Sequence, residues 1–253
     1  MKTMNKVTIV LLTTVAAASV NAGSLDYRGE YKHESEEFAH RVKIGSSVKL
    51  SDPAKLYFSI EQKFNSHDKS DFFYQVERGD SEFDWGVAYT LNKNWYVQPG
   101  MPITFGNGKT TYKPQLRIGY KADFGLTTAL RYRHEFQSFV DGTSDATSSD
   151  GNSKISRDGK TLQQGKITLT GSYKFSDEAW KNLQLSYEAN YNHNYDDVRL
   201  SNNENWEWDL GVKVGYKIDN FRPYVELWNI KGKDGSKTDD RQLRTRVGIT
   251  YSF

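Results

Sequence analysis

The 253-residue chain contains no cysteine, only five prolines, and no long apolar segment beyond its N-terminus. Without cysteine, a disulfide framework is excluded. A membrane-spanning helix needs roughly 20 consecutive apolar residues, and the mean hydropathy of −0.76 reflects how polar the chain is. Aromatic residues nevertheless make up 14% of the chain, and they are typical of β-strands. The composition therefore favours an all-β protein over a helical membrane protein.

The N-terminus resembles a secretory signal. Lys2 and Lys6 precede an apolar run over residues 7–18, and small residues follow as far as Ala22. We expect cleavage after Ala22, which leaves residues 23–253 as one domain; an uncleaved N-terminal membrane anchor is the alternative. Loss of the two lysines takes the formal charge from +2 to about zero. Net charge thus gives no reason to expect a nucleic-acid partner.

Apolar and polar residues alternate with a period of two along most of the remaining chain, as expected for strands with one apolar face. At the C-terminus, for example, Val247 and Ile249 alternate with Arg246 and Gly248. None of the apolar faces carries a charged residue, and a Lys or Arg facing the middle of a bilayer would cost about 2–4 kcal/mol. The pattern predicts a transmembrane antiparallel β-barrel of about twelve strands, surrounded by outer-membrane lipid, over residues 25–31, 42–50, 56–60, 83–91, 95–105, 112–120, 126–132, 167–175, 183–191, 206–216, 221–227 and 243–253.

The predicted connections alternate between short and long, as periplasmic turns and extracellular loops do. The short ones are residues 51–53, 92–94, 122–124, 176–182 and 219–220, and the long ones are 33–40, 65–81, 106–111, 137–164, 192–205 and 231–240. Both chain ends would then face the periplasm. The stretch 137–164, rich in Ser, Thr, Asp and Gly, is expected to be a mobile surface loop, and its position relative to the pore is left open.

Three prolines conflict with a continuous barrel, because each removes a hydrogen-bond donor where there is no free edge. Pro99, Pro114 and Pro223 all fall within predicted strands. We expect them to mark bulges or strand ends.

The opposite faces of the predicted strands carry more basic than acidic residues, which predicts a narrow, cationic and therefore anion-selective lumen. Arginine pairs two residues apart place two guanidinium groups on the same inward face, where each can bind a carboxylate bidentately. An alternative is that these cations pair with inward acids and fill a plugged lumen. The candidate residues for a substrate path are Arg28, Arg41, Lys43, Lys113, Arg117, Arg131, Arg133, Lys213, Arg222, Arg244 and Arg246.

No pattern predicts catalysis. The five histidines lack metal-ligand spacing, and residues 106–109 lack the full spacing of a phosphate-binding loop and are expected to form a hairpin turn. We therefore predict no enzymatic activity, catalytic residue, metal or cofactor. A hydrolase site assembled across strands, a structural or adhesive barrel and a general small-anion pore remain alternatives.

Several short motifs are similar to those of one known family. They are LDYR at 25–28, WYVQPGM at 95–101, YKP at 112–114, LRYR at 130–133, RPYVE at 222–226, DRQLRTRVGI at 240–249 and the terminal YSF. Together they resemble the oligogalacturonate-specific porin (KdgM) family, which includes an N-acetylneuraminate channel. Family members also have proline at positions matching Pro99, Pro114 and Pro223, whereas the loop 137–164 departs from the family pattern.

The resemblance implies a monomeric twelve-stranded outer-membrane channel that takes up acidic sugars passively. It implies oligogalacturonates or related uronates as cargo, with sialic acid as the alternative. A role in the substrate path is implied for the basic residues in the matching motifs, namely Arg28, Arg131, Arg133, Arg244 and Arg246, and less closely for Arg117 and Arg222.

Overall fold

Antiparallel β-strands dominate the computed structural model, which describes residues 22–66, 71–200, 203–232 and 240–253. No described residue belongs to a helix with the length and apolarity needed to cross a membrane. Residues 1–21 of the predicted signal peptide lie outside the described residues, so cleavage after Ala22 stays a prediction. The strands that enclose the barrel are β1 (Ala22–Lys32), β2 (Glu37–Lys49), β3 (Ala54–Asn65), β4 (Glu77–Thr90), β5 (Trp95–Gly100), β6 (Ile103–Gly106), β7 (Lys109–Tyr112), β8 (Gln115–Lys121), β9 (Leu126–Phe139), β12 (Thr161–Lys174), β13 (Leu183–Asn194), β14 (Trp206–Tyr216), β15 (Phe221–Lys231) and β16 (Arg241–Ser252).

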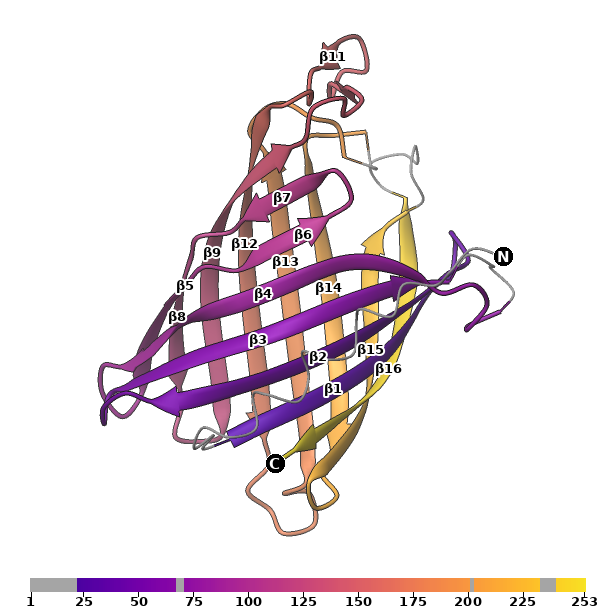
Figure 1. The fold of residues 1–253 in the computed structure, drawn as a ribbon. Helices are drawn as coiled ribbons and strands as arrows, with labels where there is room; N and C mark the ends of the chain where they lie inside the picture. The colour runs from indigo at the N-terminus through magenta and orange to yellow at the C-terminus, as the bar shows by residue number, and fades with distance from the viewer. Residues whose placement is uncertain (1–21, 67–70, 201–202, 233–239) are drawn as a thin grey trace, which may run out of the picture.

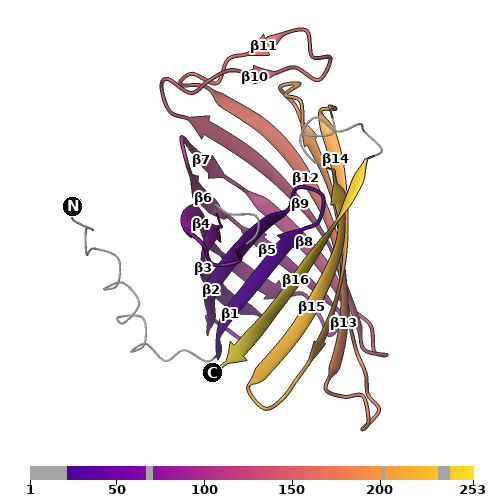
Figure 2. The ribbon, with the colours of Figure 1, turned by 90° about the vertical axis from the view of Figure 1, so that its right-hand side faces the viewer.

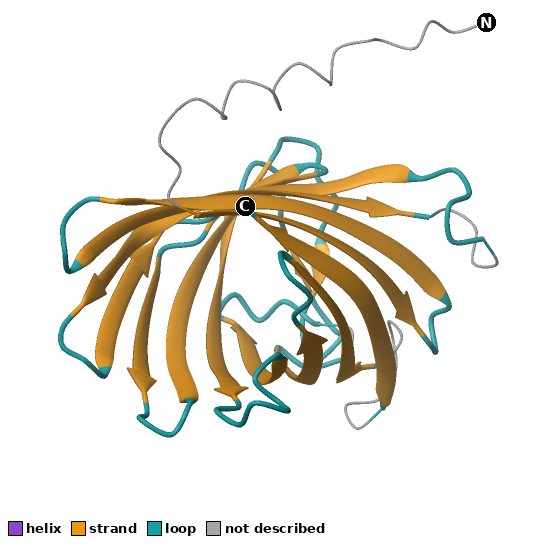
Figure 3. Cartoon of the chain, turned by 90° about the horizontal axis from the view of Figure 1, so that it is seen from below, coloured by secondary structure: helices purple, strands orange, loops and turns teal. Residues whose placement is uncertain are grey.

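The sheet closes on itself in chain order (Figures 1 and 3). The first strand β1 pairs with the last strand β16, for example Tyr27 with Ile249, and β9 pairs with β12. Closure leaves no free edge, so every strand can satisfy its backbone groups within the sheet, as a bilayer requires. The predicted transmembrane β-barrel is confirmed.

The fourteen described strands of this sheet fill twelve positions around the barrel, because two positions are each built from two consecutive shorter strands. We call each position a stave, and these two staves are broken. β5 and β6 both pair with β4, and β7 and β8 both pair with β9, in each case with the same register on either side of the break. The breaks lie at residues 101–102 and 113–114, side by side within two neighbouring staves. Sequence alternation predicted each stave as a single strand, and it could not show these interruptions because the alternation continues through them.

Each of the three problematic prolines lies where a ladder is interrupted or ends. Pro99 lies in the gap of the β4–β5 ladder between the pairs Gly86–Gly100 and Tyr89–Val97. Pro114 lies in the break between β7 and β8, where its carbonyl accepts a hydrogen bond from the His134 amide at 3.0 Å. Pro223 pairs with Ile249 of β16 but lies beyond the last pair of the β14–β15 ladder. The expectation that prolines mark irregularities or ends is confirmed.

The connections are short at the end of the barrel that holds the C-terminus and mostly longer at the other end (Figure 1). Two predicted long loops are wrong. Residues 33–36 alone connect β1 to β2, since β2 already begins at Glu37. Residues 106–109 form the hairpin turn predicted for them, in which only Asn107 and Gly108 connect β6 to β7. Gly108 has φ +72°, a conformation that glycine adopts without a steric penalty. Tight closure here therefore depends on glycine at the second central position of the turn, the one of the two that has positive φ.

The segment between β9 and β12 rises beyond the barrel at the end away from the C-terminus (Figures 1 and 2). It contains a small hairpin of β10 (Ala146–Thr147) and β11 (Lys154–Ile155). The hairpin is tied to the chain after β13, since Arg199 donates a backbone hydrogen bond to Thr147 at 2.8 Å and Ser148 bridges to Val198. The strands also extend three residues into the predicted loop 137–164 at its start, to Phe139.

Gly86 marks a close approach near the interrupted ladder, and its replacement should destabilise the barrel. A Cβ atom at Gly86 would lie 2.3 Å from the backbone carbonyl oxygen of Pro99. We expect Gly86→Ala to lower the free energy of unfolding by about 1–3 kcal/mol, the usual cost of overpacking. Urea unfolding in lipid vesicles measures this. Gly45→Ala, whose Cβ would lie 3.2 Å from the Ser59 Cβ, is the matched control, and equal losses in the two variants would contradict the steric explanation.

Candidate functional site

The two faces of each stave differ in character. On β9, Leu130 and Tyr132 are 55% and 45% exposed, whereas Arg131 between them is half-buried. On β16, Val247 is 58% exposed and its neighbour Arg246 is largely covered. Successive side chains of a closed barrel point alternately outward and inward. The charged side chains therefore line the lumen, and the exposed apolar side chains form the outer surface.

All of the basic residues predicted for a substrate path lie on the inner face, where Arg133 is buried and the others are half-buried. Their partners divide them into two groups. Ion pairs with described carboxylates are formed by Arg28, Arg41, Lys113, Arg133, Lys213, Arg244 and Arg246. Among the described residues no carboxylate forms an ion pair with Lys43, Arg117, Arg131 or Arg222. The alternative of pairing with inward acids thus applies to the first group and not to the second.

Glu30 of β1 is shared by three arginines. Arg246 Nε lies 2.5 Å from Glu30 Oε2, and Arg244 Nε and Arg28 Nη2 both lie 3.9 Å from the same oxygen. The β1–β16 register produces this cluster, because Glu30 is directly opposite Arg246. One carboxylate therefore compensates part of the charge of three cations.

A second cluster surrounds Asp26 on the same strand. Arg41 Nη2 lies 2.5 Å from Asp26 Oδ1, and Arg41 Nη1 lies 3.3 Å from Glu61. The hydroxyl groups of Tyr224 and Thr250 also donate to Asp26, at 3.0 and 2.7 Å. Arg41 is thus neutralised and held in place rather than free to exchange partners.

Two inward aromatic residues of β15, which the sequence analysis did not single out, contact the basic side chains near these clusters. Trp228 donates its indole N–H to Glu226 at 3.0 Å, and the guanidinium groups of Arg244 and Arg246 lie 4.8 and 4.9 Å from its ring centre. Tyr224 lies under the Lys213 ammonium group at 3.4 Å. Such cation–π contacts restrict the basic side chains. The alternation of β15 puts both aromatic residues on the inner face, so parity alone could have found them.

Another set of inward basic side chains lies on β8, β9 and β12. Arg131 is directly opposite Arg117 on β8 and Thr168 on β12. Arg131 Nη2 donates to Thr168 at 3.0 Å, while its buried Nε has no hydrogen-bond partner among the described residues. Two residues further along β9, Arg133 Nε donates to Gln115 at 3.0 Å, and Arg133 lies 3.8 Å from Glu135. Lys166 of β12 is directly opposite Arg133. We call the surface formed by Arg117, Arg131, Arg133 and Lys166 the arginine wall, and it keeps positive charge facing the lumen.

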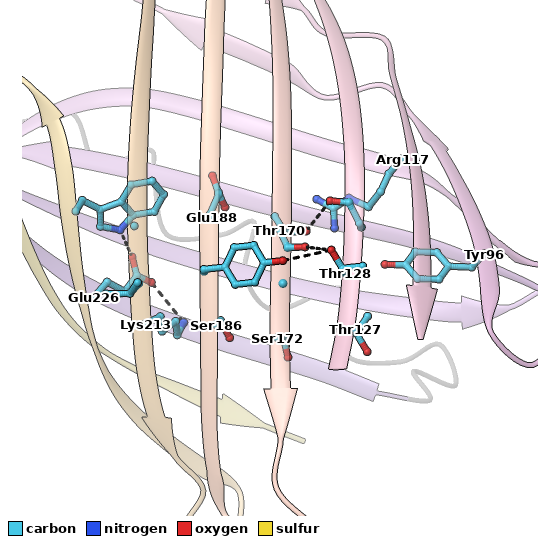
Figure 4. A pocket seen from close by; sticks show the side chains of 16 residues that line it. Tyr96, Arg117, Thr127, Thr128, Thr170, Ser172, Ser186, Glu188, Lys213 and Glu226 are labelled. Carbon is cyan, nitrogen blue, oxygen red and sulfur yellow. Dashed lines mark hydrogen bonds and ion pairs between the residues drawn. The ribbon is translucent and has the colours of Figure 1, made fainter. Parts of the chain in front are cut away.

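A hollow of about 300 Å³ lies against the inner wall from β5 to β15 (Figure 4). Small side chains create it: Ala129 and Gly211 lie in its floor, and Ser172 and Ser186 are direct neighbours on adjacent strands. Its rim carries Arg117 and Tyr96 on one side and Lys213, Glu226 and Trp228 on the other, with Glu188 between them. Because its lining extends over consecutive strands, the hollow is part of the pore lumen.

Comparison with known proteins gives the same architecture and a family. The model of the family described as oligogalacturonate-specific porin protein (KdgM) matches residues 16–253. The oligogalacturonate-specific porin KdgM of Dickeya dadantii (strain 3937) is 31% identical, over 97% of this chain and 99% of that protein. A solved KdgM porin covers 91% of this chain and 99% of its own, with a TM-score of 0.60 at 23% identity, and another structure is of the KdgM porin in complex with disordered oligogalacturonate.

A second relative is the N-acetylneuraminic acid outer membrane channel protein NanC of Escherichia coli (strain K12). It is 22% identical, over 97% of this chain and 96% of that protein. A solved NanC porin covers 90% of this chain and 98% of its own, with a TM-score of 0.67 at 17% identity. These relatives are porins and channels of the outer membrane, and the described barrel has their fold. The chain belongs to the oligogalacturonate-specific porin (KdgM) family and is an outer-membrane β-barrel porin.

Proposed function

We propose that this porin takes up acidic oligosaccharides by passive, anion-selective diffusion, with oligogalacturonates or related uronate oligomers as cargo. The observation that carries the proposal is the arginine wall, where Arg117 and Arg131 are cross-strand neighbours with no ion pair to a described carboxylate. Two adjacent cations facing the lumen attract carboxylates and repel cations. A bound anion would supply the negative charge that no described carboxylate supplies to these two arginines.

The cargo class is supported by the relatives. The Dickeya dadantii protein, at 31% identity, is named an oligogalacturonate-specific porin, and both galacturonate and sialic acid carry carboxylates that guanidinium groups bind bidentately. Sialic acid is the second candidate because NanC is named as its channel. The higher identity to KdgM favours uronates.

Transport needs weak successive contacts, since a tight site would hold the sugar and reduce flux. Arg117, Arg131 and Arg133 offer neighbouring carboxylate partners along β8 and β9. The proposed cycle contains no chemical step, catalytic residue or cofactor, and one chain forms a complete closed barrel, which is consistent with a monomer.

Recordings from the purified protein in planar bilayers test this function. We expect chloride to be more permeant than potassium in a salt gradient, and we expect trigalacturonate to block the current at lower concentration than sialic acid does. A channel that does not conduct would contradict the porin function. Cation preference would contradict the anion-selective path. Stronger block by sialic acid than by trigalacturonate would make sialic acid the favoured cargo.

A further inference from the structure

The loop that joins β3 to β4 projects sideways from the barrel (Figure 1). Residues 72–76 of this loop, with the sequence FFYQV, carry no charge, whereas Asp71 precedes them and Glu77 follows them. We call residues 72–76 the aromatic foot. Its Phe73 and Tyr74 side chains are 68% and 47% exposed. Large apolar side chains grouped on a surface mark a site of contact with another apolar surface.

The first residue of the aromatic foot fixes it to the outer face of the barrel. The ring of Phe72 lies across Gly29 of β1, where an added Cβ atom would be 2.5 Å from the ring. The carbonyl oxygen of Phe72 lies 2.6 Å from His40 Nε2. Because a carbonyl oxygen can only accept, Nε2 is the donor, and in the neutral ring Nδ1 accepts from the Tyr27 hydroxyl at 2.9 Å. Backbone and ring of Phe72 are thus both held by the barrel wall.

Ring contacts continue this attachment along β2. His40 is on the outer face of β2, as Val42 is, yet it is only 5% exposed whereas Val42 is 39% exposed. The rings of Phe72 and Phe73 cover it, with centres 4.2 and 5.0 Å from the imidazole centre. Phe38, also on this face, meets the Phe72 ring edge-on at 5.3 Å. The aromatic foot therefore lies outside the barrel, on the side that faces lipid.

Hydrogen bonds give the foot a defined shape. The Ser66 amide donates to the Phe38 carbonyl at 3.1 Å. The Ser66 hydroxyl lies 2.6 Å from the carbonyl oxygen of Asp71 and 3.0 Å from that of Tyr74. The Phe73 amide donates to Asp71 Oδ1 at 2.9 Å. The exposed rings are therefore presented by an ordered turn.

The surface next to the foot is the lipid-facing surface of the porin. Gly29 is directly opposite His40 on β2 and Val247 on β16, and Val247 is one of the most exposed apolar side chains of the outer face. The foot thus continues an apolar surface that the bilayer already covers. Aromatic rings at the end of a transmembrane barrel lie at the boundary between headgroups and acyl chains, and the charged residues on either side of the foot can remain in water.

We propose that the aromatic foot anchors the porin in the outer membrane by inserting into the leaflet at the end of the barrel away from the C-terminus. Phe72 and His40 hold the foot against the wall, and Phe73 and Tyr74 enter the boundary between headgroups and acyl chains. The foot thereby fixes the height of this side of the barrel relative to the leaflet. This role does not depend on which sugar the channel carries.

The test uses single-cysteine variants, since the chain has no cysteine of its own. Tyr74→Cys carries an NBD fluorophore in the foot and leaves Phe72 and Phe73 in place. Val247→Cys on the outer face is the lipid reference, and Asn152→Cys, exposed in the β10–β11 hairpin beyond the barrel, is the water reference. In phosphatidylcholine vesicles brominated near the headgroup, we expect lipid quenching at Tyr74→Cys to exceed that at Asn152→Cys by about threefold or more. Aqueous iodide should show the reverse order.

A second variant tests the attachment. Gly29→Val in the Tyr74→Cys background places a side chain where the Phe72 ring lies, so we expect the foot to be released and lipid quenching to fall about threefold towards the water reference. Gly165→Val in the same background is the matched control, because a Cβ atom there would meet the ring of Tyr195 instead, 2.5 Å from its hydroxyl. This control should leave the quenching unchanged.

Heat-modifiable migration on gels checks that each variant forms a barrel. Quenching of the Tyr74→Cys label by iodide as strongly as at Asn152→Cys would place the foot in water and overturn the proposal. A label that neither quencher reaches is covered by protein, and disulfide-linked dimers of unlabelled Tyr74→Cys would then identify a second copy as the occupant in place of lipid. Lipid quenching that is unchanged by Gly29→Val would show that Phe72 does not hold the foot, which also contradicts the proposal.

Discussion

Reversal of Arg117 and Arg131 to glutamate should turn the channel from anion-selective to cation-selective. The two side chains are cross-strand neighbours in the arginine wall, so the double variant changes the charge at one place in the lumen by four units. Charges screen over about 10 Å at 0.1 M salt, and we expect the permeability ratio to change by more than about tenfold at that ionic strength and by much less in concentrated salt. The zero-current potential in a KCl gradient measures it.

Lys49→Glu with Lys55→Glu provides the matched control for this reversal. These residues are also cross-strand neighbours, but they lie at the strand ends where solvent reaches them, and both are exposed. The same charge change there should shift the zero-current potential by only a small fraction of the shift in the Arg117/Arg131 double variant. An equal shift in both double variants would show that selectivity follows the total charge and not the arginine wall.

Replacement of Glu30 by alanine should give the largest loss of stability among the lumenal acids. Glu30 and Arg246 are only 12% and 11% exposed, and Arg28 and Arg244 share the same carboxylate. Removing one partner of a fully enclosed ion pair costs about 3–5 kcal/mol; because the lumen is hydrated, we expect a decrease of about 2–3 kcal/mol in the free energy of unfolding. Urea unfolding in lipid vesicles measures it.

Glu135→Ala is the comparison for Glu30, since the one ion pair of Glu135 within the described residues is with Arg133, at 3.8 Å. This replacement should lower the free energy of unfolding by less than about 1 kcal/mol. The Glu30 variant should also prefer anions more strongly than the wild type, because three arginines lose their shared counter-charge. Unchanged stability together with unchanged selectivity would contradict the assigned role of Glu30.

The sequence was sufficient to predict the barrel because a bilayer imposes a strict rule on each strand. Leu130 and Tyr132 must face lipid, so Arg131 must face inward, and the same reasoning applies from β1 to β16. The rule concerns neighbours along one strand, and it holds through the broken staves at residues 101–102 and 113–114. It therefore gave the number of staves without showing where two of them are interrupted.

The electrostatics of the lumen could not be predicted in the same way, because they depend on register between strands. Glu30 and Arg246 are separated by 216 residues in the chain and meet only because β1 closes on β16. The sequence placed Arg244 and Arg131 in the same class of inward cation, yet one lies over Trp228 beside Glu30 and the other has no ion pair to a described carboxylate. The alternation along a strand determines which residues face inward, but the register between strands determines which of these cations have a carboxylate partner.

The separation of the paired acids from the arginine wall has a consequence for charge balance during transport. Asp26, Glu30 and Glu61 are held by arginines of their own, away from Arg117 and Arg131 on β8 and β9. The charge of Arg117 and Arg131 is therefore balanced by small anions from solution. Under the proposed function, each carboxylate of a sugar that reaches the arginine wall displaces one of these anions. Sugar and small anion then exchange places, and no opposing potential builds up.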